Sequence, residues 1–544
     1  MSKSKKSGPV SDDEISPYQV TAGMKANSGN APPVSNRGRN ATLVAALLGW
    51  MFDGFEMGLF PLIGRPALKE LLEGSGHAGT ESDWFGVIVA VFLVGAASGG
   101  VLFGWMGDKI GRVRAMSLSI FTYAVFTGLC GFATEAWHIA VLRFVASLGM
   151  GGEWSLGVAL VNEIWPGKSR AFIAGLIGAA SNVGFLLVAL LSIGLTGFIG
   201  TIQPMLLTVG ISEKSSQLLM ANSAWRFLMI SGAFPALLIF FIRLFVPESS
   251  KWEEERDSGK TSHWSNVDLF GVLTGCLAAI GIIYVWSPLV KDVSSWLRVL
   301  ATLLGLGVCL LGFLFPVRQF LTRAVAAGKI PAAQKLQVIN RMLLGSSLAG
   351  VALLGTWGSI QWAPSWADEL QPNGKSVTLD DGTVVEGVKY FAKEKTQAAL
   401  AIGAIVGTIL AAFAAGKFGR RITYAVLCIA SVGAAVYFYQ GHSAFNSSFL
   451  FAAVLAGGVT ASFYGFFPLY FPELFPTAVR ATGQGFSFNF GRIIAAIGGL
   501  QTANLKAYFG GDLPKAGSAL AAIYLIGVFI VWLGPETKGE SLPE

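Results

Sequence analysis

The sequence predicts an all-α integral membrane protein made of two six-helix bundles and an extra central two-helix hairpin, about 14 transmembrane helices in all. The first observation behind this fold class is composition: the 544 residues are 53% hydrophobic and only 13% charged. That leaves too little charged surface to coat a soluble protein of this length. The second observation is that the apolar runs are long enough to cross a bilayer core of about 30 Å, and they fall into two matching sets.

Six predicted spans precede residue 247, and six more follow residue 340. They lie at 41–63, 84–106, 114–133, 137–160, 171–197 and 225–246, and at 341–363, 396–416, 422–440, 449–470, 482–505 and 517–534. Two further apolar runs, at 267–288 and 296–316, predict the hairpin. Because a hairpin crosses the membrane twice, the second set still starts from the same side.

The chain divides accordingly into five predicted segments. A polar segment rich in Ser, Lys, Asn, Gly and Pro predicts a disordered tail that is kept in the mature protein. The segments are the tail 1–40, the N-terminal bundle 41–246, a central segment 247–340 that holds the hairpin (267–316), the C-terminal bundle 341–534 and a second tail 535–544. Residues 317–340 mix basic and apolar residues, which fits either an amphipathic interfacial helix or a plain linker. The loop 364–395 carries an Asp381-Gly382 turn that predicts a small β-hairpin.

The two halves repeat the same charged landmarks in the same order. A Gly-Arg pair comes first, a Glu follows 51 or 53 residues later, and a second Arg lies seven residues beyond that Glu. The landmarks are Arg112, Glu163 and Arg170 in the first half and Arg420, Glu473 and Arg480 in the second. Each half then closes on Pro-Glu-Ser (247–249) or Pro-Glu-Thr (535–537). Duplicated apolar halves are typical of secondary transporters.

The distribution of basic residues predicts the orientation. With the N-terminus inside, 25 of the 39 Lys and Arg residues face the cytoplasm and 12 face outward, while Arg143 and Arg492 lie within spans. This bias follows the positive-inside rule. It predicts a multi-pass protein of the plasma membrane, in bacteria the inner membrane, with both termini cytoplasmic.

The repeated charges predict a gate at the cytoplasmic surface. Its expected members are Asp108, Arg112, Glu163, Arg170, Arg420, Glu473 and Arg480. Asp108 could cap a facing helix, while Arg112 and Arg170 could share Glu163. Gly416 stands in the second half where Asp108 stands in the first, so the gate is expected to be asymmetric. The alternative is that these are ordinary loop charges that set topology.

Together these motifs resemble the major facilitator superfamily. The resemblance rests on the Gly-Asp-Lys-Ile-Gly-Arg loop at 107–112, the doubled Glu-to-Arg spacing and the two Pro-Glu endings, and it covers nearly everything from residue 41 onward. It implies the major-facilitator fold, in which two bundles rock about a central site. It also implies inner-surface ion pairs that are closed in the outward-facing state and broken in the inward-facing one.

Two symporter groups of that superfamily are similar to this chain. Asp53-Gly54-Phe55-Glu56 resembles the Asp-Gly-aromatic-Asp motif of aromatic-acid/proton symporters, with Glu in place of the final Asp. The extra hairpin resembles that of sialate/proton symporters. Both groups move organic acids, so the resemblance implies a proton-coupled symporter of a small carboxylate that works by alternating access.

Charges at membrane depth predict the coupling residues, because an ionised group there is costly unless it is paired or hydrated. Asp53 and Glu56 lie three residues apart, which predicts that they share one face of the first span. Glu56 matches Arg143 in depth, roughly 10 Å below the outer surface. The proton-coupling prediction is therefore Asp53, Glu56 and Arg143. In this hypothesis Glu56 takes a proton from outside and frees Arg143. The alternative is that the pair only holds two spans together.

Arg492 predicts the substrate class, since a fixed cation at cavity depth suits a carboxylate. Alternatively, Arg492 neutralises Asp53 or Glu153. The predicted substrate-binding residues are Asp53, Glu153, Gln361, Gln484, Asn489 and Arg492, and the aromatic residues that could line the cavity are Trp357, Trp362, Phe463 and Tyr464.

A sugar/proton symporter of the sugar-porter type is the main alternative. That group shares the Glu-to-Arg spacing and the acid-plus-Arg pair of spans one and four. Its paired glutamines in span seven and its Gly-Pro-x-x-Trp in span ten are replaced here by the segments 357–362 and 465–468. A non-transporting membrane sensor on the same scaffold is a further alternative.

Other function classes are excluded by what the sequence lacks. The three Gly-Lys-Ser/Thr sites lack the first Gly of a phosphate-binding loop, and the four His residues are scattered, so neither ATP chemistry nor an enzyme is expected. No cofactor or metal is expected, and the net charge of +7 is spread along span ends rather than gathered for nucleic acid. The expected partners are the small-molecule substrate, protons and the lipid bilayer, and the protein is expected to be a monomer.

Overall fold

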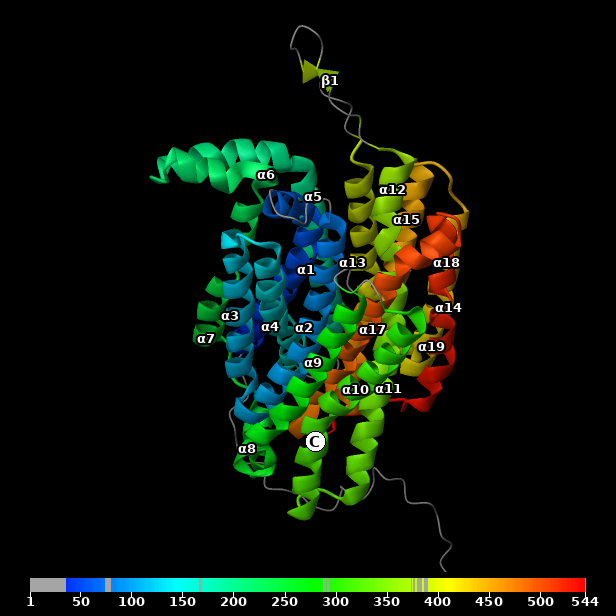
Figure 1. Ribbon diagram of the computed structural model, residues 1–544. Coiled ribbons are helices and arrows are strands. Elements are labelled where there is room, and N and C mark those ends of the chain that lie inside the picture. Colours follow the sequence, from blue (N-terminus) through cyan, green and yellow to red (C-terminus); the bar gives the residue numbers. More distant parts are fainter. Residues whose placement is uncertain are drawn as a thin grey trace, which may run out of the picture.

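Figure 1 shows the computed structural model, in which long helices stand side by side as two groups with a green hairpin in front of them. The structure describes residues 36–543, apart from 74–79, 166–168, 287–289, 291–292, 373, 375–376, 379–383 and 386–389. Most of the predicted N-terminal tail lies outside the described residues. The first helix already begins at Asn36.

The first half contains the six predicted spans. They are α1 (Asn36–Leu72), α2 (Glu81–Ile110), α3 (Arg112–Leu129), α4 (Ala136–Ile164), α5 (Arg170–Thr208), and a sixth that is divided between α6 (Glu213–Ser231) and α7 (Ala236–Phe245). The division falls at Pro235, whose ring cannot donate the backbone hydrogen bond that would continue α6.

The central segment and the second half follow in the predicted order. The central helices are α8 (Ser250–Asp257), α9 (Leu269–Trp286) and α10 (Ser295–Ala326). The second half consists of α11 (Ala332–Gly358), α12 (Ala363–Leu370), α13 (Ala392–Phe418), α14 (Arg420–Gln440), α15 (Ser447–Thr460), α16 (Phe463–Leu474), α17 (Arg480–Tyr508), α18 (Leu513–Ala521) and α19 (Tyr524–Ile530). Short 3-10 turns lie at Cys130–Phe132, Lys260–His263, Asn266–Asp268, Ile360–Trp362, Thr477–Val479 and Val531–Leu533.

The predicted β-hairpin is present in the loop before α13. Strands β1 (Val377–Thr378) and β2 (Val384–Val385) pair antiparallel, with Val377 opposite Val385. The Asp381-Gly382 turn itself lies outside the described residues.

The predicted all-α membrane fold is confirmed, and the figure of 14 spans holds approximately. Among the described residues, 12 helical stretches are long and apolar enough to cross a membrane. The other two predicted spans are helical as well. One is α17, which carries Gln484, Asn489 and Arg492 in its sequence, and the other is the divided helix α6–α7.

Two stretches differ from the prediction. Residues 317–340 form no separate interfacial helix, because α10 continues to Ala326 and stops only near Gly328, which has a φ of +68°, and Pro331. The end of α5 and the start of α6 extend beyond the predicted spans. The backbone of α6 is non-helical from Ala221 to Ala224, and Figure 1 shows the part of α6 before this kink lying across one end of the first half.

The two halves meet along two matching seams. One seam joins α2 to α17 and the other joins α5 to α13. These pairs are equivalent, because α2 and α13 are the second spans of their halves and α5 and α17 are the fifth. The hairpin α9–α10 packs on α2 through α9 and on α11 and α17 through α10. It therefore lies along the α2–α17 seam and touches both halves.

Glycines allow the helices within each half to approach closely. A Cβ at Gly99 of α2 would overlap the carbonyl oxygen of Leu148 in α4, and a Cβ at Gly407 of α13 would overlap that of Gly458 in α15. These are equivalent helix pairs in the two halves. Small residues at such contacts let backbones pack against each other in membrane proteins.

We expect Gly99→Ala to destabilise the protein by about 1–3 kcal/mol, because the added methyl group forces α2 away from α4. The measurement is the midpoint of thermal unfolding of the purified protein. Gly433→Ala in α14 is the control, since a Cβ there meets nothing within 4 Å. Equal midpoints for the two variants would contradict the close approach.

Candidate functional site

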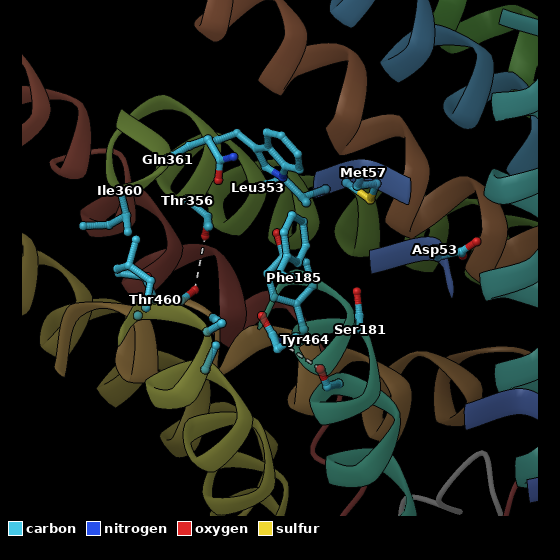
Figure 2. A pocket seen from close by; sticks show the side chains of 18 of the residues that line it. Asp53, Met57, Ser181, Phe185, Leu353, Thr356, Ile360, Gln361, Thr460 and Tyr464 are labelled. Atoms are coloured by element: carbon cyan, nitrogen blue, oxygen red, sulfur yellow. Dashed lines mark hydrogen bonds between the residues drawn. The ribbon is translucent and has the colours of Figure 1, made fainter. Parts of the chain in front are cut away.

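A cavity of about 120 Å³ lies between the two halves. Figure 2 shows that its side chains come from both of them: Met57, Ser181 and Phe185 belong to the first half, and Thr356, Gln361 and Tyr464 belong to the second. Asp53, also from the first half, lies at one side, and its carboxyl group points away from these residues. Thr356 donates a hydrogen bond to the carbonyl oxygen of Thr460 on the same wall, at 3.2 Å. The volume of this central cavity suits a small molecule.

Asp53 of α1 and Arg492 of α17 are the charged residues of this cavity among its lining side chains. Both are buried, with exposed fractions of 6% and 7%. The Oδ1 atom of Asp53 and the Nη1 atom of Arg492 have no hydrogen-bond partner among the described residues. The guanidinium lies 5.4 Å from the ring centre of Phe488, a cation–π contact. Both atoms are buried next to the cavity, so one donor and one acceptor are left unsatisfied there.

Glu153 of α4 lies behind Asp53 and does not line the cavity. The carboxyl groups of the two residues lie close to each other in the buried interior. Two carboxyl groups can form a hydrogen bond only if one of them carries a proton. The Asp53–Glu153 pair is therefore a place where a single proton can be held next to the cavity.

Glu56 and Arg143 form a buried ion pair between α1 and α4. Nη1 of Arg143 donates to Oε1 of Glu56 at 2.7 Å. The guanidinium is also flanked by the rings of Phe60, at 4.4 Å, and Phe92, at 4.6 Å. The cation is thereby held by a charge on one side and by aromatic faces on the others.

Asp53 and Glu56 do not face the same space, contrary to the expectation of a shared helix face. Asp53 lines the central cavity, and Glu56 lines a different one inside the first half. Residues three apart on a helix differ by about 60° around its axis, which is enough here for the two residues to line different cavities.

Gln484 and Asn489 were expected to bind substrate, but they do not line the cavity. Gln484 donates to the carbonyl oxygen of Ser155, and Asn489 donates to that of Gly151 at 3.2 Å. Both acceptors belong to α4. These amides therefore hold the second half against the first. Of the six predicted substrate-binding residues, Asp53, Gln361 and Arg492 line the cavity.

Several residues that line the central cavity were not predicted from the sequence. Ser181 and Asn182 of α5, and Gln397 of α13, lie within or beside apolar runs. A polar residue inside a span is the signal that could have identified them. Among the aromatic residues, Trp357 and Tyr464 line the cavity as expected, whereas Trp362 and Phe463 do not.

The repeated charges form two buried clusters at one end of the bundle, which we call the gate end. In the first cluster the Oε1 atom of Glu163 accepts hydrogen bonds from Nη2 of Arg112, at 3.2 Å, and from Nη1 of Arg480, at 2.8 Å. All three side chains are fully buried. Arg112 belongs to the first half and Arg480 to the second, so the cluster ties the halves together.

The second cluster is built in the same way. The Oε1 atom of Glu473 accepts a hydrogen bond from Nη2 of Arg420 at 2.6 Å, and it lies 3.6 Å from Nη1 of Arg170. Arg170 therefore does not share Glu163 with Arg112, as the sequence had led us to expect; it crosses to Glu473, and Arg480 takes its place at Glu163. The reason is that each Glu lies at a seam, where the nearest second arginine comes from the other half.

Asp108 caps a helix of the opposite half, as expected. It accepts hydrogen bonds from the backbone N–H groups of Ala481, at 3.2 Å, and Thr482, at 2.8 Å, at the start of α17. A carboxylate at a helix N-terminus is stabilised by the exposed N–H groups there. Gly416 stands at the equivalent place in α13 and has no side chain that could form such a cap, so the gate end is asymmetric.

Glu248 and Glu536, from the Pro-Glu endings, cap α3 and α14. Glu248 accepts from the N–H of Arg112 at 2.9 Å, and Glu536 accepts from that of Arg420, also at 2.9 Å. Burial raises the pKa of the Glu248 carboxyl above its usual range, although these hydrogen bonds act in the other direction. The endings therefore fix the helices that carry the gate arginines.

The family model described as Major Facilitator Superfamily matches residues 42–367, and the model described as Sugar (and other) transporter matches residues 390–544. The chain is 26% identical to the cis,cis-muconate transport protein of Acinetobacter baylyi, over 81% of this chain and 82% of that protein. It is 24% identical to a putative niacin/nicotinamide transporter of Bacillus subtilis, over 94% and 100%.

The fold is also similar to a solved structure. A proton:xylose symporter bound to 6-bromo-6-deoxy-D-glucose superimposes with a TM-score of 0.60. It is 16% identical in sequence, and the alignment covers 93% of this chain and 98% of that one. At this identity the likeness concerns the fold alone.

We expect Arg480→Ala to cost more stability than Arg170→Ala. Arg480 is fully buried and 2.8 Å from its partner, and its loss leaves a buried polar cluster incomplete, at a cost of roughly 3–5 kcal/mol. The Arg170 side chain is 12% exposed, and its Nη1 atom lies 3.6 Å from Glu473. The Arg170–Glu473 interaction is therefore weaker, and removing Arg170 should cost less. Thermal unfolding of the purified variants measures the difference. An equal or reversed order would show that the two clusters do not differ as described.

Proposed function

Because the chain belongs to the Major Facilitator Superfamily, whose model matches more than half of it, we propose that this membrane transporter is a proton-coupled symporter of a small organic acid. The observation that carries the substrate class is the buried guanidinium of Arg492, which lines the central cavity with an Nη1 atom left without a partner among the described residues. A carboxylate is the ligand that such a group binds best.

The remaining cavity wall supports the same class. Its aromatic and aliphatic side chains, such as Trp154, Phe185 and Tyr464, suit the carbon skeleton of an organic acid. Gln361 offers an amide for a second polar group. The names of two relatives agree with this, since muconate and niacin are both carboxylic acids.

Proton coupling is proposed to run through the two acids of α1. Glu56 is bound to Arg143, and protonation of Glu56 would release the guanidinium and loosen α1 from α4. Asp53 and Glu153 would hold a second proton beside the substrate. Since an unpaired charge in the membrane is costly, each change of proton occupancy favours one arrangement of the helices.

The gate end is proposed to face the cytoplasm, in line with the excess of Lys and Arg on that side, and both termini with it. Its ion pairs are intact here, which supports the proposal that the protein is closed on that side. The protein is proposed to act as a monomer in the plasma membrane. Opening toward the cytoplasm then requires that Arg480 and Arg170 leave their partners.

A sugar transporter is the second candidate, favoured by the match of residues 390–544 to the Sugar (and other) transporter model. Trp357 and Gln361 of the cavity are residue types that bind sugars. A neutral sugar, however, would leave Arg492 unpaired. A thermal-shift screen of the purified protein against benzoates, short monocarboxylates, sialate and hexoses separates the two candidates.

We expect Arg492→Ala to weaken the binding of an acid ligand roughly 10- to 100-fold, because a charge-assisted hydrogen bond is lost. Nicotinate is the probe and nicotinamide, which lacks the charge, is the matched ligand whose binding changes little. Lys506→Ala is the control, since Lys506 lies on the same helix and pairs with Glu369. If Arg492→Ala spared acid binding and removed hexose binding, the sugar candidate would replace this proposal.

We expect Glu56→Gln to keep the exchange of substrate across the membrane but to lose uphill uptake driven by a pH gradient, because glutamine cannot carry the proton. The measurement is uptake and counterflow in proteoliposomes. Glu70→Gln, on the same helix and bound to Arg226, is expected to retain both activities. Full accumulation in the Glu56 variant would refute its role in coupling.

A further inference from the structure

A groove of about 870 Å³ lies on the second half, between α11 on one side and α14 with the end of α19 on the other. Its long wall is one face of α11, because the lining residues there recur every three or four positions from Ala333 to Ser347. The opposite wall consists of Arg421 and of residues between 530 and 535. The groove shares no lining residue with the central cavity, and the proposed transport cycle does not use it.

The groove lies at the edge of the membrane-spanning region, at the gate end. Arg341, Arg421 and Gly534 stand at, or one residue outside, the limits of the first, third and sixth predicted spans of the second half. Lipid headgroups meet the hydrocarbon core at this level. Leu344 and Ile530 also line the groove and lie further inside their spans, at the depth of the acyl chains.

The lining of the groove contains two arginines and no carboxylate. Nη1 of Arg341 donates to the carbonyl oxygen of Leu474 at 3.0 Å, and Nε of Arg421 donates to that of Gly534 at 2.8 Å. These bonds hold both guanidinium groups in the walls. The two Nη atoms of Arg421 are neither buried nor hydrogen-bonded to a described residue, so a ligand can reach them.

Glu536 is an acid beside this wall, but its carboxylate is occupied by the backbone. It accepts hydrogen bonds from the N–H groups of Arg420, at 2.9 Å, and of Arg421, at 3.1 Å, and so caps α14. The guanidinium of Arg421 forms no ion pair with a described residue. The groove therefore presents a positive charge to the headgroup region.

Charge and apolar surface together restrict the ligand. A phosphate is the headgroup anion that a guanidinium binds best. A soluble anion would satisfy Arg421 but leave the apolar side chains of the groove uncovered, and Leu533 is 81% exposed. A zwitterionic lipid would bring a fixed cation close to the two arginines. An anionic phospholipid matches both parts of the groove, since basic pockets between helices at this level suit such headgroups.

We propose that this groove binds an anionic phospholipid from the leaflet at the gate end, with its phosphate on the Nη atoms of Arg421 and an acyl chain along Leu344 and Ile530. Arg341 adds to the positive potential on the opposite wall. The bound lipid contacts α11, α14 and α19 at once. Its binding does not depend on whether the protein transports an acid.

The test is native mass spectrometry of the purified full-length protein, titrated in detergent with dioleoylphosphatidylglycerol. The matched probe is dioleoylphosphatidylcholine, which has the same chains and phosphate but carries a fixed cation. We expect the first molecule of the anionic lipid to bind about tenfold more tightly than the zwitterionic one. Arg421→Gln should remove this preference, whereas Arg421→Lys, which keeps the charge, should retain most of it.

Ser347→Trp tests the apolar part of the groove and leaves the bond between Arg421 and Gly534 intact. Ser347 is exposed on the groove wall, so the indole fills the space intended for the acyl chain. We expect both lipids to bind about tenfold more weakly to this variant. Unaltered binding of both lipids would show that no chain occupies the groove and would overturn the proposal.

Lys417→Gln is the control, because Lys417 is exposed at the same end of the bundle and does not line the groove. Its lipid binding should equal that of the unmodified protein. An equal loss in Lys417→Gln and Arg421→Gln would reduce the effect to general surface charge and refute a site. Equal affinities for the two lipids, or an unchanged preference in Arg421→Gln, would refute it as well. Displacement of the lipid by an equal concentration of glycerol 3-phosphate would identify a soluble anion as the occupant instead.

Discussion

The exchange of arginines at the gate end is the interaction on which the arrangement of the two halves depends. Glu163 and Glu473 each bind one arginine of their own half and one of the other, Arg480 and Arg170 respectively. Buried charges of this kind are tolerable only when they are fully paired. The clusters are therefore stable when the halves are together and unstable at intermediate separations, which favours two discrete states over a gradual motion.

The same division between halves governs the central cavity. Asp53 belongs to the first half and Arg492 to the second, and both approach the cavity with an unpartnered atom. A ligand that bridges them contacts both halves at once, so its binding energy depends on their relative position. In the proposed function, the ligand and the gate would therefore both depend on the relative position of the two halves, which meet at the α2–α17 and α5–α13 seams.

Much of this site could be predicted, because the position of a residue along a membrane-spanning helix determines its depth in the membrane. A helix rises by a constant amount per residue, so the matched depth of Glu56 and Arg143 was readable before any contact was known, and their distance is 2.7 Å. The direction in which a side chain points around the helix axis could not be predicted in the same way. Gln484 and Asn489 lie at suitable depths, yet they bind backbone carbonyls of α4 instead of lining the cavity.

Apolar length, internal duplication and charge placement thus specified the fold class, the two halves and the residues of the two charged clusters, since these follow from the cost of exposing polar groups to lipid. Which arginine meets which glutamate and which acid of α1 faces which cavity were determined by how the helices pack. Those features depend on rotations about helix axes and on contacts between residues more than 300 positions apart, such as Glu163 and Arg480, which a single sequence does not encode locally.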